Sequence, residues 1–137
     1  MKNESYEELL RKRAIRQKYL DDIVSAAMTR AVDSVFHREP PIKSHTFYGA
    51  SAIHPRHLVI WYIFDIDSNL RAALESGLTV ELEAKTRSEL MAGGYPSEAV
   101  PNVYIAFTST EDVQRKSGGD LHVYFNSGTV GFQNPRY

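Results

Sequence analysis

The chain has 137 residues, a formal net charge of −1 and no cysteine. This length suits one domain with its own core, and the lack of thiols excludes disulfides, thiolate metal sites and cysteine nucleophiles. The polar residues 1–5 predict no signal peptide, and no run approaches the ~20 apolar residues of a membrane span. We therefore expect one domain over residues 1–137, of bacterial type, in the cytoplasm, with neither a membrane nor a nucleic-acid partner.

A long helix is predicted from Ser5 to about Arg38, because this stretch contains no glycine or proline. Ser5 and Glu8 have the spacing of a capping box. At roughly 33 residues the helix would be ~50 Å long, so we expect a break, a frayed first turn or a projecting end at residues 1–18. Three- and four-residue spacing predicts one apolar stripe along it, made of Leu20, Ile23, Val24, Ala27, Met28, Ala31, Val32 and Val35.

The most apolar run, residues 57–66, is predicted to be the central strand of a sheet. It contains the single tryptophan, Trp61, and it hardly alternates with polar residues. This pattern is typical of a strand that is covered on both faces. Residues 44–53 predict a preceding strand, and the short connection at 54–56 makes the two a β-hairpin.

Two helices, or one helix bent at Gly77, are predicted next, over about residues 67–93. Residues 102–108 predict a third strand, which is followed by a turn or a short helix. Alternating apolar residues at 121–126 predict a fourth strand.

An edge piece at residues 129–132 and a flexible tail at 133–137 complete the chain. The expected fold class is therefore α+β. It consists of a mainly antiparallel sheet of about four strands, with the long N-terminal helix and the shorter helices packed on one face.

The sheet face turned away from the helices is predicted to be rich in tyrosine. A rigid ring with a polar tip suits a protein interface. The alternative is a plain sheet surface on which tyrosine is simply a good strand residue. The residues of this face are Tyr104, His122 and Tyr124, with Tyr48 and Tyr62 joining them according to the strand register.

A basic cluster lies in the first part of the long helix, and acidic residues flank it on both sides. It is either a solvated helical face or a contact for an acidic partner protein. The candidate contacts within the cluster are Arg11, Arg13 and Arg16.

No stretch carries a recognisable catalytic or metal motif. His54 and His57 flank a proline in a turn, and zinc would need three or four converging ligands. Asp65 and Asp67 are predicted to end a strand and cap a helix. Residues 117–119 follow a short helix and precede a strand, which reverses the order that a phosphate loop needs. We expect no metal, no cofactor and no catalytic residue.

Residues 79–90, 94–100 and 106–115, followed by Gly118-Gly119 before an aromatic segment, carry a resemblance. They resemble small uncharacterised bacterial proteins of the polymorphic-toxin immunity type. The resemblance implies a cytoplasmic protein that neutralises one toxin domain by binding it, and it supplies no active-site residues.

Three hypotheses for function follow. The first is a non-catalytic protein-binding module, in its narrow form an immunity protein that neutralises a bacterial toxin domain. The second is a small α+β enzyme or ligand-binding protein, with Asp65 or His122 as acid–base group and a pocket between the sheet and the long helix lined by Trp61, Tyr104, His122 and Tyr124. The third, compatible with either, is a homodimer formed through the helix stripe or the sheet.

Overall fold

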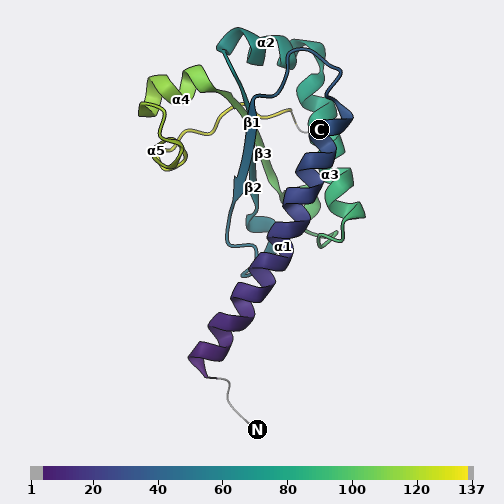
Figure 1. Ribbon diagram of the computed structural model, residues 1–137, viewed down its shortest axis with the longest axis vertical. Coiled ribbons are helices and arrows are strands. Elements are labelled where there is room, and N and C mark those ends of the chain that lie inside the picture. The colour runs from purple at the N-terminus through teal and green to yellow at the C-terminus, as the bar shows by residue number, and fades with distance from the viewer. Residues whose placement is uncertain (1–4, 136–137) are drawn as a thin grey trace.

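The computed structural model describes residues 5–135 and shows an α+β fold around a three-stranded sheet (Figure 1). This confirms the fold class and the long N-terminal helix, whereas the expected sheet of about four mainly antiparallel strands is wrong. The elements are α1 (Tyr6–Ser34), β1 (Ser44–Tyr48), the turn η1 (Pro55–His57), β2 (Val59–Phe64), α2 (Asp67–Ser76), α3 (Leu78–Ala92), the turn η2 (Val100–Asn102), β3 (Tyr104–Ser109), α4 (Thr110–Ser117) and α5 (Leu121–Phe125).

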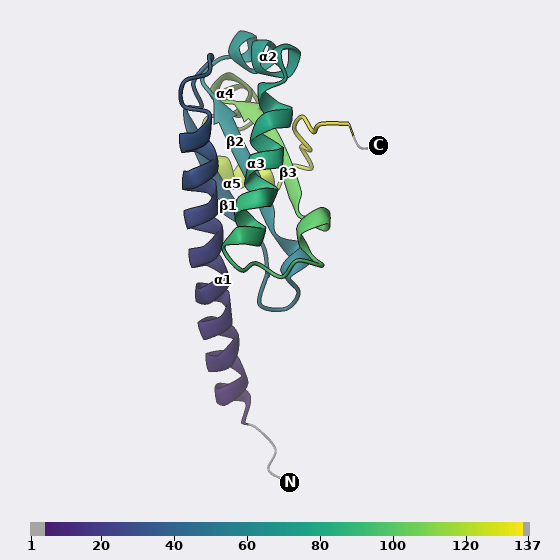
Figure 2. The same ribbon diagram turned by 90° about the vertical axis from the view of Figure 1, so that its right-hand side faces the viewer.

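The helix α1 packs on the sheet along its second half and projects beyond the sheet along its first half (Figure 2). The side chain of Ser5 caps it by accepting a hydrogen bond from the backbone N–H of Glu8 at 3.1 Å. The buried stripe is Leu20, Val24, Ala27, Met28 and Ala31. Of the three alternatives, the structure shows the projecting end; residues 1–4 lie outside the described residues. Within residues 5–135, no helix combines the length and apolarity needed to cross a membrane.

The strand β2 lies in the middle of the sheet and is covered on both faces, as predicted. Alternate side chains enter two separate clusters of buried residues. Ile60, Tyr62 and Phe64 join a large cluster with α1, α2 and α3. Trp61 joins a small one on the opposite face, where α4 and α5 pack. Helices therefore cover both faces, and the expectation of helices on one face only is wrong.

The sheet contains one antiparallel and one parallel strand pair, because different connections join its strands. β1 and β2 form the predicted antiparallel pair, with Thr46 opposite Trp61. Between β2 and β3 the chain makes a crossover through two helices, which brings β3 back parallel to β2. Gly77 joins those helices with a φ of 81°, a left-handed conformation that favours glycine, so the predicted break is confirmed.

The predicted fourth strand is instead the short helix α5. Asp120 caps it by accepting from the backbone N–H of Val123 at 3.1 Å. Alternation over five residues does not distinguish a strand from a single amphipathic helical turn. In the helix Tyr124 is buried, while Leu121 and Val123 are exposed, which is the reverse of the alternation that places Tyr124 on the face turned away from the helices.

Two further predicted strand segments are shorter than expected. β1 ends at Tyr48, because Gly49 turns the chain with a φ of 129° and a Cβ there would lie 2.1 Å from the carbonyl oxygen of His57. The edge piece at 129–132 reduces to one antiparallel bridge between Phe107 and Phe132. Beyond it, Asn134 docks on α3 through Thr79, with two hydrogen bonds of 2.9 Å. Residues 136–137 of the predicted tail lie outside the described residues.

Candidate functional site

The carboxyl edge of the parallel strands β2 and β3 corresponds to the place where ligands bind in many open sheets. Two helices begin there, α2 after β2 and α4 after β3. Ser109 caps α4 by accepting from the backbone N–H of Asp112 at 3.0 Å, and it donates to the carboxylate of Asp67 at 2.5 Å. Glu111 accepts from the backbone N–H of Asp67 at 2.7 Å. At this edge, side chains of the protein therefore bind the backbone N–H groups at the start of α2 and α4.

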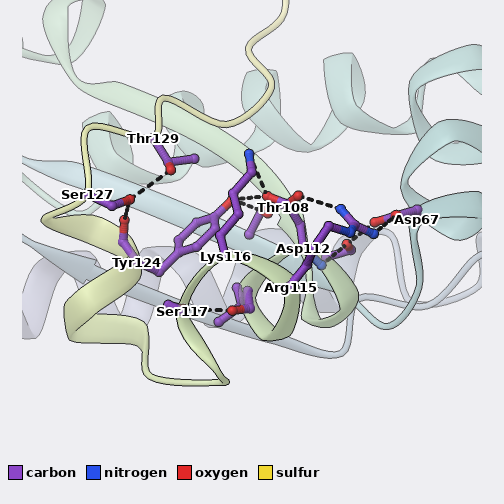
Figure 3. Close-up of polar contacts among 11 residues, drawn as sticks. Asp67, Thr108, Asp112, Arg115, Lys116, Ser117, Tyr124, Ser127 and Thr129 are labelled. Atoms are coloured by element: carbon purple, nitrogen blue, oxygen red, sulfur yellow. Dashed lines mark hydrogen bonds and ion pairs between the residues drawn. The ribbon is translucent and has the colours of Figure 1, made fainter.

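The carboxylate of Asp67 is bound on both sides. The hydroxyl of Ser109 and the guanidinium of Arg115 hold the pKa of Asp67 below its usual value. Arg115 also binds Asp112, at 2.8 Å (Figure 3). A carboxylate that is ionised and paired at neutral pH is a poor general acid, and its basicity is reduced. Asp67 is the first residue of α2, whose N-cap is Ile66 with no side-chain cap hydrogen bond, so the predicted cap at Asp67 is wrong.

Tyr124 links the same network to α5. Its hydroxyl lies 2.7 Å from Thr108 Oγ1 and donates to Asp112 Oδ2 at 2.6 Å (Figure 3). Burial and the hydrogen bond to Asp112 raise the pKa of Tyr124 far above its usual value, so the phenol stays protonated. Lys116 contacts the same carboxylate at 3.3 Å. The network thus ties α5 to the sheet, and it leaves no activated nucleophile among these residues.

A cavity of about 190 Å³ lies beside this network. Asp67, Asp112 and Arg115 form its polar wall, and the remaining lining is mostly apolar. Within residues 5–135, no three histidine, aspartate or glutamate side chains are grouped as a metal site would require. The arrangement supports a structural function for this edge of the sheet.

The predicted tyrosine face does not exist as one surface. Tyr62 points to the opposite side of the sheet, fully buried, with its hydroxyl 2.6 Å from Thr86 Oγ1. Tyr124 is also fully buried, on α5 instead of on a strand. His122 is exposed on α5. Neither Tyr62 nor Tyr124 therefore belongs to an exposed sheet face, because the strand register places Tyr62 on the α1 side and a helix replaces the strand predicted for Tyr124.

Tyr48 and Tyr104 do come together, beside Trp61, in an open groove of about 420 Å³. The indole N–H of Trp61 donates to Tyr48 Oη at 3.2 Å. The hydroxyl of Tyr104 donates to the backbone carbonyl of Val130 at 2.6 Å, and burial raises its pKa. This groove lies on the α5 face, whereas the space between the sheet and α1, where the second hypothesis places a pocket, is filled by buried side chains.

Sequence reasoning missed the residues at the mouth of this groove, which are Arg56 and His57. They were interpreted only as an exposed turn. Their signal was their place immediately before the central strand, where a turn can lie over the start of the sheet. The contribution of Thr129 and Val130 to the same groove had no signal, because no pattern in the sequence shows where the C-terminal segment docks.

The basic cluster lies on the projecting half of α1, where Arg11, Arg13 and Arg16 are all exposed. Gln17 forms the junction with the body of the protein, since it donates to the carbonyl of Gly49 at 3.3 Å and accepts from the N–H of Ala52 at 3.0 Å. Sequence reasoning missed the large apolar side chains exposed on the same half, which are Tyr6, Leu9, Leu10, Ile15 and Tyr19.

Three of these side chains continue the buried stripe of α1. Tyr6, Leu9 and Leu10 lie at three- and four-residue steps that lead through Arg13 and Gln17 to Leu20, the first buried position. The stripe that packs on the sheet therefore extends past the end of the sheet. Its signal was the same periodicity, followed further toward the N-terminus.

Comparison of the chain with models of protein families, with curated proteins and with solved structures finds no match.

Proposed function

We propose that this protein is a non-catalytic protein-binding module, and that it binds its partner through the projecting half of α1. The observation that carries the proposal is the exposure of large apolar side chains on the part of α1 that projects beyond the sheet. Tyr6 is 74% exposed and Leu10, on the same face of the helix, is 45% exposed. Clustered apolar groups at a surface mark interaction sites more often than singly scattered ones do.

The charge of the projecting half indicates the chemistry of the partner. Residues 6–19 contain five basic side chains, Arg11, Lys12, Arg13, Arg16 and Lys18, against two acidic ones, Glu7 and Glu8. A partner with an apolar groove and an acidic rim would match both features, in the way amphipathic helices dock in grooves. The charges would speed and orient the encounter, and the apolar groups would supply the affinity.

This charge pattern favours a different chain over a second copy as the partner. Two copies that paired through this segment would bring together two basic surfaces, which repel. Nucleic acid would satisfy the charges, but a phosphate backbone offers no partner for Leu9, Leu10 and Ile15. The saturated network around Asp67 and Tyr124 supports a non-catalytic protein.

In its narrower form, the proposal is that the partner is a bacterial toxin domain that this protein neutralises in the cytoplasm. Only the resemblance of residues 79–90, 94–100 and 106–115 supports this form. It predicts that the gene for the partner lies beside the gene for this chain. Coexpression with the product of that neighbouring gene would relieve its toxicity.

The test begins by trapping the partner with a photoreactive side chain at Tyr6, followed by reconstitution from purified proteins. Calorimetry then compares Leu9→Glu/Leu10→Glu with the wild type. We expect at least about a 100-fold loss of affinity, as for truncation of interface anchors. The same charge change at Val80→Glu/Met91→Glu, two exposed apolar positions on α3, is the matched control and should keep the affinity.

Two results would contradict the proposal. One is a complex that forms equally well with Leu9→Glu/Leu10→Glu. The other is an equal loss of affinity in the α3 control, which would show a response to added charge anywhere on the protein. In addition, Arg13→Gln/Arg16→Gln should slow association and weaken its dependence on salt, with a smaller effect on dissociation.

A further inference from the structure

The groove on the α5 face contains three aromatic side chains and one cation. Trp61, Val59, Tyr48 and Tyr104 line it, and the strand register places Val59 of β2 between Tyr48 of β1 and Tyr104 of β3. Arg56 lines it as well. Its volume of about 420 Å³ is in the range of small-molecule sites.

Two hydrogen-bond donors of this groove are unused. Tyr48 Oη accepts from Trp61, and across residues 5–135 no acceptor is bonded to the Tyr48 hydroxyl proton. The guanidinium of Arg56 likewise has no ion pair or side-chain hydrogen bond anywhere in the described part of the chain. A phenol proton and a guanidinium are therefore both free to bind an acceptor on a ligand.

The charge of the residues that line the groove indicates whether a cationic or an anionic ligand fits it. No aspartate or glutamate lines the groove, and Arg56 is positive, with His57 beside it. A quaternary ammonium ion would find aromatic rings here but would face the guanidinium. An anion would find both donors, and a flat ring would find aromatic side chains on which to stack.

We infer that this groove binds a small, flat aromatic carboxylate, with its ring between Tyr48 and Tyr104 and its carboxylate at Arg56 and the Tyr48 hydroxyl. The inference is independent of the proposed function, since no residue of α1 contributes to the groove. Because the groove is open to solvent, we expect weak and readily reversible binding.

The single tryptophan makes the test direct. In a heteronuclear NMR spectrum of the whole chain, the indole N–H of Trp61 gives a signal of its own. We expect phenylacetate to shift this signal to saturation below about 10 mM. Phenylacetamide, which has the same ring without the charge, and choline, which tests a cation-binding cage, should leave it in place.

Variants then locate the carboxylate. Arg56→Gln should weaken phenylacetate binding about tenfold or more, because a charged hydrogen bond is lost. Lys85→Gln, the same charge change at an exposed position of α3, should leave it unchanged. Equal binding by Arg56→Gln and the wild type would overturn the inference. A saturable response to choline in place of phenylacetate would also overturn it, as would the absence of saturation by any of the three compounds.

Discussion

The two faces of the sheet each bury one tyrosine completely, yet they are held by different interactions. On the α1 and α3 face, Tyr62 is one ring within a large apolar cluster, and among the described residues its hydroxyl is hydrogen-bonded only to Thr86. On the α4 and α5 face, Tyr124 belongs to a cluster of four buried residues and reaches both Thr108 and Asp112. The first face is stabilised mainly by its large buried apolar surface, and the second by a few directed hydrogen bonds.

This difference matters for how each face could serve function. A large apolar cluster holds the second half of α1 against the sheet, and the first half projects from it as a continuous helix. The small cluster holds two short helices and the C-terminal segment around an open groove. Local opening is expected first where few apolar contacts are buried, so the groove face should be the more adaptable of the two.

The largest expected effect is on the apolar face. Leu82 is fully buried in the large cluster, and Leu82→Ala removes three carbons from a site that cannot collapse fully. We expect a loss of about 2–5 kcal/mol in the free energy of unfolding. Urea unfolding, followed both by Trp61 fluorescence and by far-ultraviolet circular dichroism, measures it. The two probes should coincide, because this cluster connects α1, α3 and the sheet.

Val80→Ala is the control on the same helix, since Val80 is exposed and should change stability by less than about 0.5 kcal/mol. If Leu82→Ala cost no more than this control, the apolar face would not be the main source of stability. A Trp61 transition that preceded the loss of helix would show that the two faces unfold separately.

The second effect compares the two buried tyrosines directly. Tyr124→Phe leaves the buried hydroxyl of Thr108 without its partner and removes a donor from Asp112, so we expect a loss of about 1–3 kcal/mol. Tyr62→Phe should cost less, about 0.5–1.5 kcal/mol, because Thr86 keeps its bond to the carbonyl of Leu82 at 2.7 Å. The same urea measurement ranks the two variants.

Hydrogen exchange provides the second measurement for this pair. Tyr124→Phe should speed exchange in α5 while leaving α3 protected, since the hydroxyl joins α5 to the sheet. The opposite ranking of the two tyrosines would break the distinction between an apolar face and a hydrogen-bonded one.

The apolar face was largely predictable because its signals are periodic. Leu20, Val24 and Met28 repeat at helical spacing, and residues 58–64 form an uninterrupted apolar run. The crossover helices and the break at Gly77 also followed from local sequence. The parallel pairing of β2 with β3 did not, since it depends on where the crossover places the chain in space.

The groove face was not predictable, because it too depends on where distant parts of the chain meet in space. Residues 121–126 are too few to show a period, and Asp120 makes them a capped helix. The contact of Tyr124 with Asp112 and the position of Arg56 over the start of the sheet are tertiary. The exposed residues Leu9 and Leu10 could have been found, because they extend a stripe that was already identified.

The smallest expected effect is the pH response of the network at the carboxyl edge. Because Ser109 and Arg115 lower the pKa of Asp67 in the folded protein, its ionised form stabilises the fold. This stability is fully present above the usual pKa near 3.8, and it is lost as the pH falls through the lower folded value. The side chain is more than a third exposed, so solvent screening limits the contribution to about 0.5 kcal/mol.

Asp67→Asn should therefore be slightly less stable than the wild type at pH 7, and the difference should shrink as both are titrated into acid. Asp65→Asn is the matched control, because Asp65 is exposed and makes one ion pair, with Lys43 at 3.2 Å. A deficit for Asp67→Asn that persisted unchanged at low pH would mean that shape, and not charge, holds this edge. The groove face would then depend on its hydroxyl hydrogen bonds alone, and the contrast with the apolar face would rest on Tyr124, Thr108 and Ser109.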